Sequence, residues 1–247
     1  MNIMERQDFV NDKLTLIQQT EGLTFGTDAL LLASYINGRH KRGCEFGSGS
    51  GIISMLLVTR EKLEHTVAVE VQQEYAALTE RNISLNNLGD RITAVHIDIR
   101  DYKPDLEFDI IYTNPPYMKT DSGKKNNLEK KNIARHEVCG DIFDFCSSAA
   151  RMLKYGGFFT AVYRPDRLID LITAMRGARL EPKRITFVHA DTDAEPSMAL
   201  IEGKNGGKGG LIVTKPLIIY RDKSHKDYTD DMNYIMENGS FPSEYKR

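Results

Sequence analysis

The chain has 247 residues, of which 40% are hydrophobic and 28% charged, and its formal net charge is −2 at pH 7. This composition is typical of a globular domain and excludes intrinsic disorder as the main state, and the length is enough for one large α/β domain. The longest apolar runs, 29–36 and 52–58, are far shorter than the roughly 18 residues that a membrane span needs.

Residues 1–40 form a lead-in to the first strand of the main domain. Within it, 14–18 and 23–25 are short β-rich runs that we expect to pair as a hairpin. Thr27 and Asp28 stand directly before the first apolar run, where a Thr or Asp is a natural N-cap. The lead-in is therefore predicted to hold a hairpin and a helix.

After the lead-in, short β-rich runs alternate with amphipathic helical runs. The predicted strands are 43–46, 66–71, 92–97, 108–113, 158–163 and 185–189. Apolar residues at three- and four-residue spacing predict helices over 51–60, 73–86, 142–153 and 166–176. This alternation predicts an α/β fold, with a parallel sheet covered on both faces.

The last part of the pattern differs. Runs 198–202 and 211–220 are joined by a glycine-rich link, which favours an antiparallel pair at one edge of the sheet. The polar segment 222–247 is expected to be a loosely packed tail. Because no clean linker is present, we expect one domain over 41–221, with the lead-in before it and the tail after it.

A glycine-rich turn follows the first of these strands. Gly47, Gly49 and Gly51 allow the backbone to pass close to a ligand at the carboxyl end of that strand. A dinucleotide-binding turn has the motif G-x-G-x-x-G, which requires a glycine at position 52. Ile52 stands there instead. With Glu45 two residues ahead, the loop fits a ligand that has no pyrophosphate, and S-adenosylmethionine is the obvious candidate.

Two acids follow the next two strands. Glu70 is placed to accept both ribose hydroxyl hydrogens, and Asp98 to accept from an adenine amino group. Their neighbours Val71 and Ile99 are expected among the cofactor contacts. Since the acids end successive strands, we expect them at the same edge of the sheet as the glycine turn.

The fourth strand ends in the tetrapeptide Asn114, Pro115, Pro116 and Tyr117. Together with the glycine turn, this motif resembles the S-adenosylmethionine-dependent methyltransferases that act on planar exocyclic or amide nitrogens. The resemblance implies that the tetrapeptide is catalytic and that Asn114 also contacts the cofactor. It further implies a Rossmann-like class I fold, with a mainly parallel seven-stranded sheet and an antiparallel edge hairpin.

The chemistry explains these residue types. The lone pair of an exocyclic amine is delocalised into the ring, and two acceptors that hold its two hydrogens localise that pair. Asn114 offers its side-chain carbonyl, and Pro115 offers a backbone carbonyl in a loop fixed by its ring. Tyr117 offers a face on which the base stacks. Most of the rate would come from holding nitrogen and methyl at near-attack geometry.

A wider resemblance covers roughly residues 5–220. The segment 25–33, Phe-Gly-Thr-Asp-Ala-Leu-Leu-Leu-Ala, is similar to the bacterial tRNA adenine-N6 methyltransferases, whose target is the adenine beside the anticodon of a valine tRNA. The runs 135–137, 164–168 and 198–203 are similar to the Gram-positive branch of that family. The resemblance implies that Phe25 packs near the methionyl end of the cofactor. It leaves Thr27 and Asp28 either contacting the cofactor amino group or capping the helix.

Two segments carry excess positive charge. Residues 119–135 have six Lys or Arg against two Asp or Glu, and residues 164–184 have six against three. If both lie on one rim, they are expected to hold RNA phosphates, with Lys183 and Arg184 extending the track. The main candidates are Lys119, Lys124, Lys125, Lys130, Lys131, Arg135, Arg164 and Arg167.

Alternatives remain at this stage. The same tetrapeptide serves enzymes that methylate guanine N2 in ribosomal RNA or glutamine N5 in release factors. A non-catalytic protein that binds S-adenosylmethionine or a nucleoside is the alternative from another class. The resemblance favours the hypothesis that the protein transfers a methyl group to adenine N6 in RNA, with tRNA as the partner.

The three cysteines, Cys44, Cys139 and Cys146, make no C-x-x-C motif. This argues for a reduced compartment and against a structural zinc site. The polar start of the chain, 1–12, does not read as a secretory signal. We therefore expect a cytoplasmic protein with no metal and no membrane partner, and nothing in the pattern indicates an oligomeric state.

Overall fold

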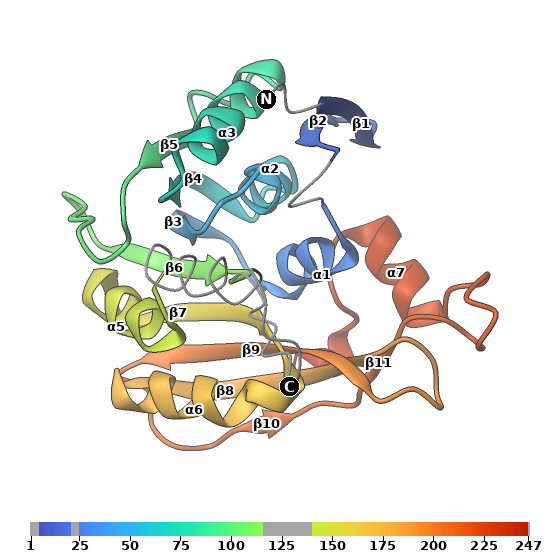
Figure 1. The fold of residues 1–247 in the computed structure, drawn as a ribbon. Coiled ribbons are helices and arrows are strands. Elements are labelled where there is room, and N and C mark those ends of the chain that lie inside the picture. Colours follow the sequence, from blue (N-terminus) through green and yellow to red (C-terminus); the bar gives the residue numbers. More distant parts are fainter. Residues whose placement is uncertain (1–4, 21–24, 116–139, 247) are drawn as a thin grey trace, which may run out of the picture.

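The computed structural model describes residues 5–20, 25–115 and 140–246. At the centre of this described part is a nine-stranded, mainly parallel sheet (Figure 1). The strand order is β10-β8-β9-β7-β6-β3-β4-β5, and β11 also pairs with β8. The seven long strands are β3 His40–Phe46, β4 Leu63–Glu70, β5 Ile92–His96, β6 Phe108–Thr113, β7 Leu153–Tyr163, β8 Leu180–His189 and β9 Pro196–Asn205. β3, β4, β5, β6 and β7 are parallel to their neighbours in this set, and β9 is antiparallel to both β7 and β8. The predicted α/β class and mainly parallel sheet are confirmed.

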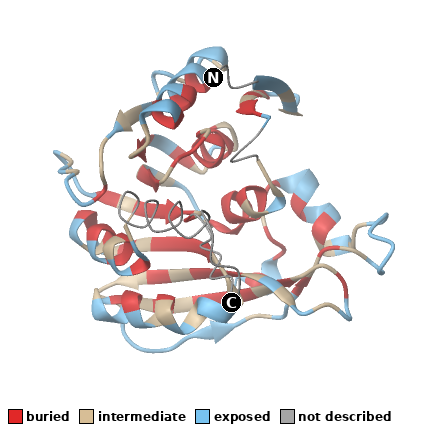
Figure 2. Ribbon diagram, in the orientation of Figure 1, coloured by how far each residue is buried: buried red, intermediate tan, exposed pale blue. Residues whose placement is uncertain are grey.

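Helices cover both faces of the sheet (Figure 1). They are α1 Thr27–Tyr35, α2 Ile52–Thr59, α3 Gln73–Leu85 and α7 Asp230–Asn238 on one face, and α5 Ile142–Met152 and α6 Leu168–Gly177 on the other. Consecutive residues of β6 belong to different cores, because successive strand side chains point to opposite faces. Tyr112 packs in the cluster that includes Leu31 of α1, and Ile111 in the cluster that includes Phe145 of α5. Figure 2 shows the buried residues gathered on the central strands and on the helix sides that face them.

An N-terminal hairpin is present among the described residues. β1 Glu5–Asn11 pairs antiparallel with β2 Leu14–Gln19. Residues 12 and 13 connect the two strands as a tight turn. The predicted pairing of 14–18 with 23–25 lies partly outside the described residues. Residues 21–24 lie outside the described residues.

The start of α1 also differs from the prediction. The helix begins at Thr27 with Gly26 as its N-cap, and no side chain caps it. The expected capping role of Thr27 and Asp28 is therefore wrong. One oxygen of the Asp28 carboxylate instead accepts from the N–H of the next residue, Ala29, at 2.9 Å, and the other accepts from Nδ2 of Asn114 at the end of β6.

An antiparallel hairpin near one edge of the sheet is present, but it joins β8 to β9, so the predicted pairing of 198–202 with 211–220 is wrong. β9 lies between β7 and β8 and has no free edge, so the later run pairs with the outer edge of β8. It does so in parallel, as the two short strands β10 Ile212–Val213 and β11 Leu217–Ile218. Pro216 stands between these strands, and because it has no N–H it cannot continue a hydrogen-bonded ladder.

The C-terminal segment is packed rather than loose. It contains α7 and a 3-10 turn, Ser243–Tyr245. Met232, Ile235, Phe241 and Tyr245 are each at most 1% exposed, and the Phe241 ring meets the Tyr35 ring of α1 edge-on at 5.3 Å. A few apolar residues spaced among polar ones are therefore enough to anchor this segment over α1.

Arg184 lies between α1 and the C-terminal segment, and not on the predicted RNA-binding surface. Its guanidinium is over the Tyr35 ring at 3.7 Å and donates to the carbonyl oxygens of Tyr35 and Tyr245, both at 2.9 Å. It also pairs with Glu202 at 3.1 Å. The residue is 3% exposed, so the expectation that Arg184 extends an RNA surface is wrong. Arg184 thus connects β8 and β9 to α1 and to the C-terminal segment.

Candidate active site

Four neighbouring parallel strands end at one edge of the sheet, and a predicted site residue stands at the end of each strand or just after it. The order β6-β3-β4-β5 places Asn114, Gly47, Glu70 and Asp98 in sequence along that edge. In an open parallel sheet this carboxyl edge is where ligands bind. The topology thus brings the predicted motifs together.

The glycine turn has the backbone conformation that requires glycine. Gly47, Gly49 and Gly51 have φ of 68°, 56° and 79°. A Cβ on Gly51 would lie 2.8 Å from the Thr79 side chain, whereas a Cβ on Gly47 would meet no atom within 4 Å. The turn is therefore closed against α3 at Gly51 and open at Gly47.

Glu70 is buried beside this turn and is held by backbone donors. One carboxylate oxygen accepts from the N–H of Gly49 and the other from the N–H of Gln72, each at 3.0 Å. An ionised carboxylate has about four lone-pair sites, so acceptor capacity remains for a ligand. Val71, directly after Glu70, is half-buried.

Glu45 lies beneath the turn. Its carboxyl accepts from the N–H of Ser54 at 3.0 Å and from the Ser54 hydroxyl at 2.5 Å. That hydroxyl is 2.8 Å from Tyr112 Oη, which is 2.9 Å from the Thr66 hydroxyl. Burial raises the pKa of Glu45 to about 8, an effect opposed by the Ser54 bonds and supported by the nearby charge of Glu70. Glu45 thus braces the start of α2, and its direct contact with a cofactor stays a prediction.

We expect the free energy of unfolding to fall with rising pH more steeply in the wild type than in Glu45→Gln. The pKa of Glu45 is about 8 in the folded protein, above its ordinary value of 4.5, so folding favours the protonated form between these values. That contribution is complete below the lower value and is lost as the pH rises through the higher one. The expected slope is about 1.4 kcal/mol per pH unit. Urea unfolding of both proteins at about pH 5.5 and about pH 7.5 measures it; the same pH dependence in both would contradict the assignment.

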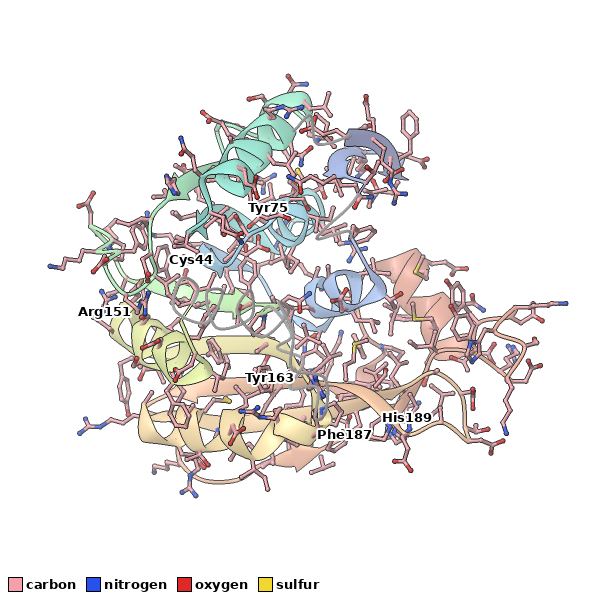
Figure 3. All side chains as sticks on the ribbon, viewed as in Figure 1. Cys44, Tyr75, Arg151, Tyr163, Phe187 and His189 are labelled. Carbon is pink, nitrogen blue, oxygen red and sulfur yellow. The ribbon has the colours of Figure 1, made fainter. Side chains whose placement is uncertain are left out.

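Asp98 is engaged by its own loop. Its carboxylate pairs with Arg100 at 2.5 Å, and this hydrogen bond lowers the pKa of Asp98. Arg151 of α5, which is labelled in Figure 3, donates to the carbonyl oxygens of Ile99 at 3.1 Å and Tyr102 at 2.8 Å. These bonds fix the loop to the helix. Ile99 itself is 6% exposed and packs in the α5 core. The predicted contact of Asp98 with an adenine amino group is thus supported only by its position at the sheet edge.

Asn114 has an unusual hydrogen-bond state. Its Nδ2 donates to Asp28 at 2.8 Å, whereas its Oδ1 is buried and accepts no hydrogen bond from the part of the chain that the structure describes. The preceding residue, Thr113, is fixed by its hydroxyl, which donates to the carbonyl of Phe46 at 2.9 Å. Pro115 is buried next to it. A buried acceptor without a partner normally costs about 1–3 kcal/mol, so it points to a ligand that supplies the donor.

Phe25 and Thr27 lie near the start of α1, half-buried and exposed respectively, and the N–H of Phe25 donates to Gln18 at 2.7 Å. Other predicted site residues lie outside the described residues: Pro116, Tyr117, Lys119, Lys124, Lys125, Lys130, Lys131 and Arg135. Arg164 and Arg167 follow β7 at the same sheet edge, and they pair with Asp166 and Asp170, each at 2.5 Å.

Asn82 of α3 is a site residue that the sequence reasoning missed. Its amide accepts from the N–H of Ile17 at 2.7 Å and donates to the carbonyl of Ile17 at 2.9 Å, as a neighbouring strand would. It also donates to the carbonyl of Ser50 in the glycine turn at 3.0 Å. Asn86, one helical turn later, holds Thr15 in the same way. A pair of asparagines four residues apart on a helix is the only sequence signal.

We expect Asn82→Ala to lower the free energy of unfolding by about 2–4 kcal/mol. The change leaves the N–H and carbonyl of Ile17 and the carbonyl of Ser50 without their hydrogen-bond partner. We also expect it to weaken the binding of S-adenosylmethionine, the cofactor predicted from the sequence, by about tenfold. Asn86→Ala is the matched control, since it releases the hairpin without touching the glycine turn. Urea unfolding and calorimetry measure the two effects. Equal loss of cofactor affinity in both variants would contradict a role through Ser50.

Among the described residues, no helix is long and apolar enough to cross a membrane, and no group of three or more His, Cys, Asp or Glu is placed to hold a metal ion. Cys44 and Cys146 are buried and unpaired as thiols, and Cys139 lies outside the described residues.

Comparison with known sequences gives consistent matches. The family model described as methyltransferase small domain matches residues 20–168, more than half of the chain. A tRNA1(Val) (adenine(37)-N6)-methyltransferase from Phocaeicola vulgatus is 28% identical over 193 residues, which are 78% of this chain and 81% of that protein. A protein of the same name from Bacteroides thetaiotaomicron is 29% identical, over 71% of this chain and 74% of the relative.

Solved structures share the fold. A predicted O-methyltransferase from Agrobacterium tumefaciens superposes with a TM-score of 0.71 at 24% identity, covering 87% of this chain and 98% of that one. A methyltransferase from Pyrococcus furiosus gives a TM-score of 0.58 at 17% identity, over 80% of this chain and 92% of the other. An N-methyltransferase from Bradyrhizobium japonicum, solved with S-adenosyl-L-homocysteine, gives 0.52 at 14% identity, over 72% and 84%.

Proposed function

We propose that this chain, which belongs to the methyltransferase small domain family, transfers a methyl group to the exocyclic N6 amine of an adenine in tRNA. Family membership makes the chain a methyltransferase, and S-adenosylmethionine is its cofactor. The observation that carries the choice of an amine is the buried Oδ1 of Asn114, an acceptor that has no partner. The named activity of the relatives favours adenine in tRNA over guanine or glutamine.

The residues at the sheet edge fit this cofactor. The open side of Gly47 lets a ligand approach the backbone, because no atom lies within 4 Å of a Cβ built there. Glu70 retains acceptor capacity beside the turn, which suits the two ribose hydroxyls. When bound, the cofactor supplies an electrophilic methyl group on a positively charged sulfur.

Asn114 and Pro115 act on the methyl acceptor. The Oδ1 of Asn114 accepts one hydrogen of the amine, and the carbonyl oxygen of Pro115 accepts the other. These two bonds turn the nitrogen lone pair out of conjugation with the ring, which makes the nitrogen a better nucleophile. The β6 end is rigid, since Thr113 and Asn114 are both hydrogen-bonded to other elements. Rigid placement of the reacting atoms supplies most of the acceleration.

The RNA contacts remain proposals. Arg164 and Arg167 lie at the catalytic edge, and phosphate binding there would exchange their present partners, Asp166 and Asp170, for phosphate oxygens. A base in a loop leaves its stack at low cost, which suits a target beside an anticodon. A tRNA substrate supports a cytoplasmic location for the enzyme.

The test uses labelled S-adenosylmethionine and total tRNA from a strain that lacks the gene, followed by nucleoside mass spectrometry. We expect labelled N6-methyladenosine with the wild type, and labelling about 10²- to 10³-fold slower with Asn114→Ala. Ribosomal RNA and a release factor are tested in parallel. Label in either of these and not in tRNA would contradict the substrate, and cofactor binding without label in any acceptor would contradict the activity.

A further inference from the structure

We infer that Asp28 is a positioning residue for methyl transfer, because it sets which end of the Asn114 side-chain amide faces the methyl acceptor. The inference rests on the proposed function, in which Oδ1 of Asn114 receives a hydrogen from the target amine. Asp28 touches neither the amine nor the methyl group in this scheme. It acts through Asn114 alone.

The contacts fix both partners. Asp28 lies in the first turn of α1, and Asn114 directly follows β6, 86 residues later in the chain. One oxygen of Asp28 accepts from the N–H of Ala29 at 2.9 Å, and the other accepts from Nδ2 of Asn114 at 2.8 Å. A Cβ on Gly26 would lie 2.6 Å from the first of these oxygens, so a glycine at that position makes room for the carboxylate.

The orientation of an amide needs such a reference. The oxygen and nitrogen ends of Asn are nearly the same size, so packing alone distinguishes them poorly. A carboxylate only accepts, and therefore only Nδ2 can face Asp28. Oδ1 is then left buried and unpartnered on the other side. A reversed amide would present N–H groups to the amine hydrogens and could not accept them.

The bond to Asp28 also strengthens the acceptor. A hydrogen bond from Nδ2 to a charged carboxylate is among the stronger kinds, and it draws electron density toward Oδ1 through the amide. The same bond offsets the cost of holding Oδ1 without a partner before substrate binds. Asp28 thus serves Asn114 both before and during the reaction.

The hydrogen-bond directions give a reciprocal test. In Asp28→Asn, the oxygen of the new amide stays with Ala29 N–H, so its NH2 faces Asn114 and reverses the Asn114 amide. In Asn114→Asp, two carboxylates face each other. In the double variant, the NH2 of residue 28 donates to the carboxylate of residue 114, whose second oxygen again faces the amine. Each single change should therefore damage the site, and the pair should repair it.

We expect each single variant to lower kcat by about 10²-fold, and the double variant to recover at least about tenfold over either. Calorimetry should give dissociation constants for S-adenosylmethionine within about twofold of the wild type in Asp28→Asn and in the double variant. Asp90→Asn, an exposed carboxylate change, is the matched control and should leave kcat unchanged. Thermal unfolding checks that all variants fold.

Two results would overturn the inference. The first is additive loss in the double variant, which indicates that each residue acts independently. The second is a dissociation constant raised tenfold or more in Asp28→Asn with kcat unchanged, which indicates that Asp28 contacts the cofactor itself. A wild-type enzyme that methylates ribosomal RNA or a release factor instead of tRNA contradicts the proposed substrate, and the same cycle is then measured with that acceptor.

Discussion

Asn114→Ala is expected to lower kcat for methyl transfer to tRNA by about 10²- to 10³-fold. The change removes the buried Oδ1, which accepts no hydrogen bond from the described residues, and with it the acceptor proposed for one hydrogen of the target amine. Because this bond matters most when the nitrogen lone pair is localised, the loss should fall on kcat rather than on cofactor affinity. Steady-state kinetics with labelled cofactor, together with calorimetry, separate the two.

Asn233→Ala provides the matched control, since Asn233 is exposed on α7. Its kcat should equal that of the wild type. The prediction for Asn114 fails if the alanine variant keeps more than about a tenth of the wild-type kcat. Removing one such hydrogen-bonding group is expected to lower kcat by at least about 10²-fold. A lower affinity for S-adenosylmethionine with unchanged kcat would assign Asn114 to cofactor binding instead.

Arg184→Met should lower the free energy of unfolding by about 3–5 kcal/mol, the usual cost of removing one partner from a buried ion pair. In the wild type, Arg184 pairs with Glu202 at 3.1 Å. The methionine fills part of the volume of the arginine side chain but leaves Glu202 without its cation. It also leaves the carbonyl oxygens of Tyr35 and Tyr245 without their donor. Urea unfolding followed by circular dichroism measures the change.

The control is Arg176→Met, in which an arginine that is 67% exposed loses a surface pair with Glu181. That variant should stay within about 0.5 kcal/mol of the wild type. A loss below about 1 kcal/mol in Arg184→Met would show that the junction between β8, α1 and the C-terminal segment does not depend on this guanidinium.

The sheet and the main site motifs could be predicted from the sequence because local pattern determines them. Positive φ requires glycine at Gly47 and Gly51, and a short β-rich run before each loop marks the strand whose end carries the motif. Proline in the tetrapeptide marks a chain that can no longer pair. These are signals within a few residues, and the topology of a parallel sheet then places them at one edge.

What the sequence could not predict depends on contacts between distant residues. Arg184 belongs to a segment rich in positive charge, and nothing local distinguishes a guanidinium buried over Tyr35 from one in solvent. The role of Asp28 depends on a partner 86 residues away. The order β8-β9-β7 leaves β9 no free edge for the run after Gly210, a constraint that exists only once the sheet is complete. Local propensity describes elements, whereas these errors concern their partners.

The junction at Arg184 has a consequence for the nascent chain during translation. The α1 helix carries Asp28, yet its far end is covered by Phe241 and Tyr245, which are synthesised after every strand of the sheet. An unfinished chain would expose Tyr35 and leave this arginine without one of its acceptors. A chain that stops short of Phe241 would thus carry Asp28 on a helix whose far end is uncovered.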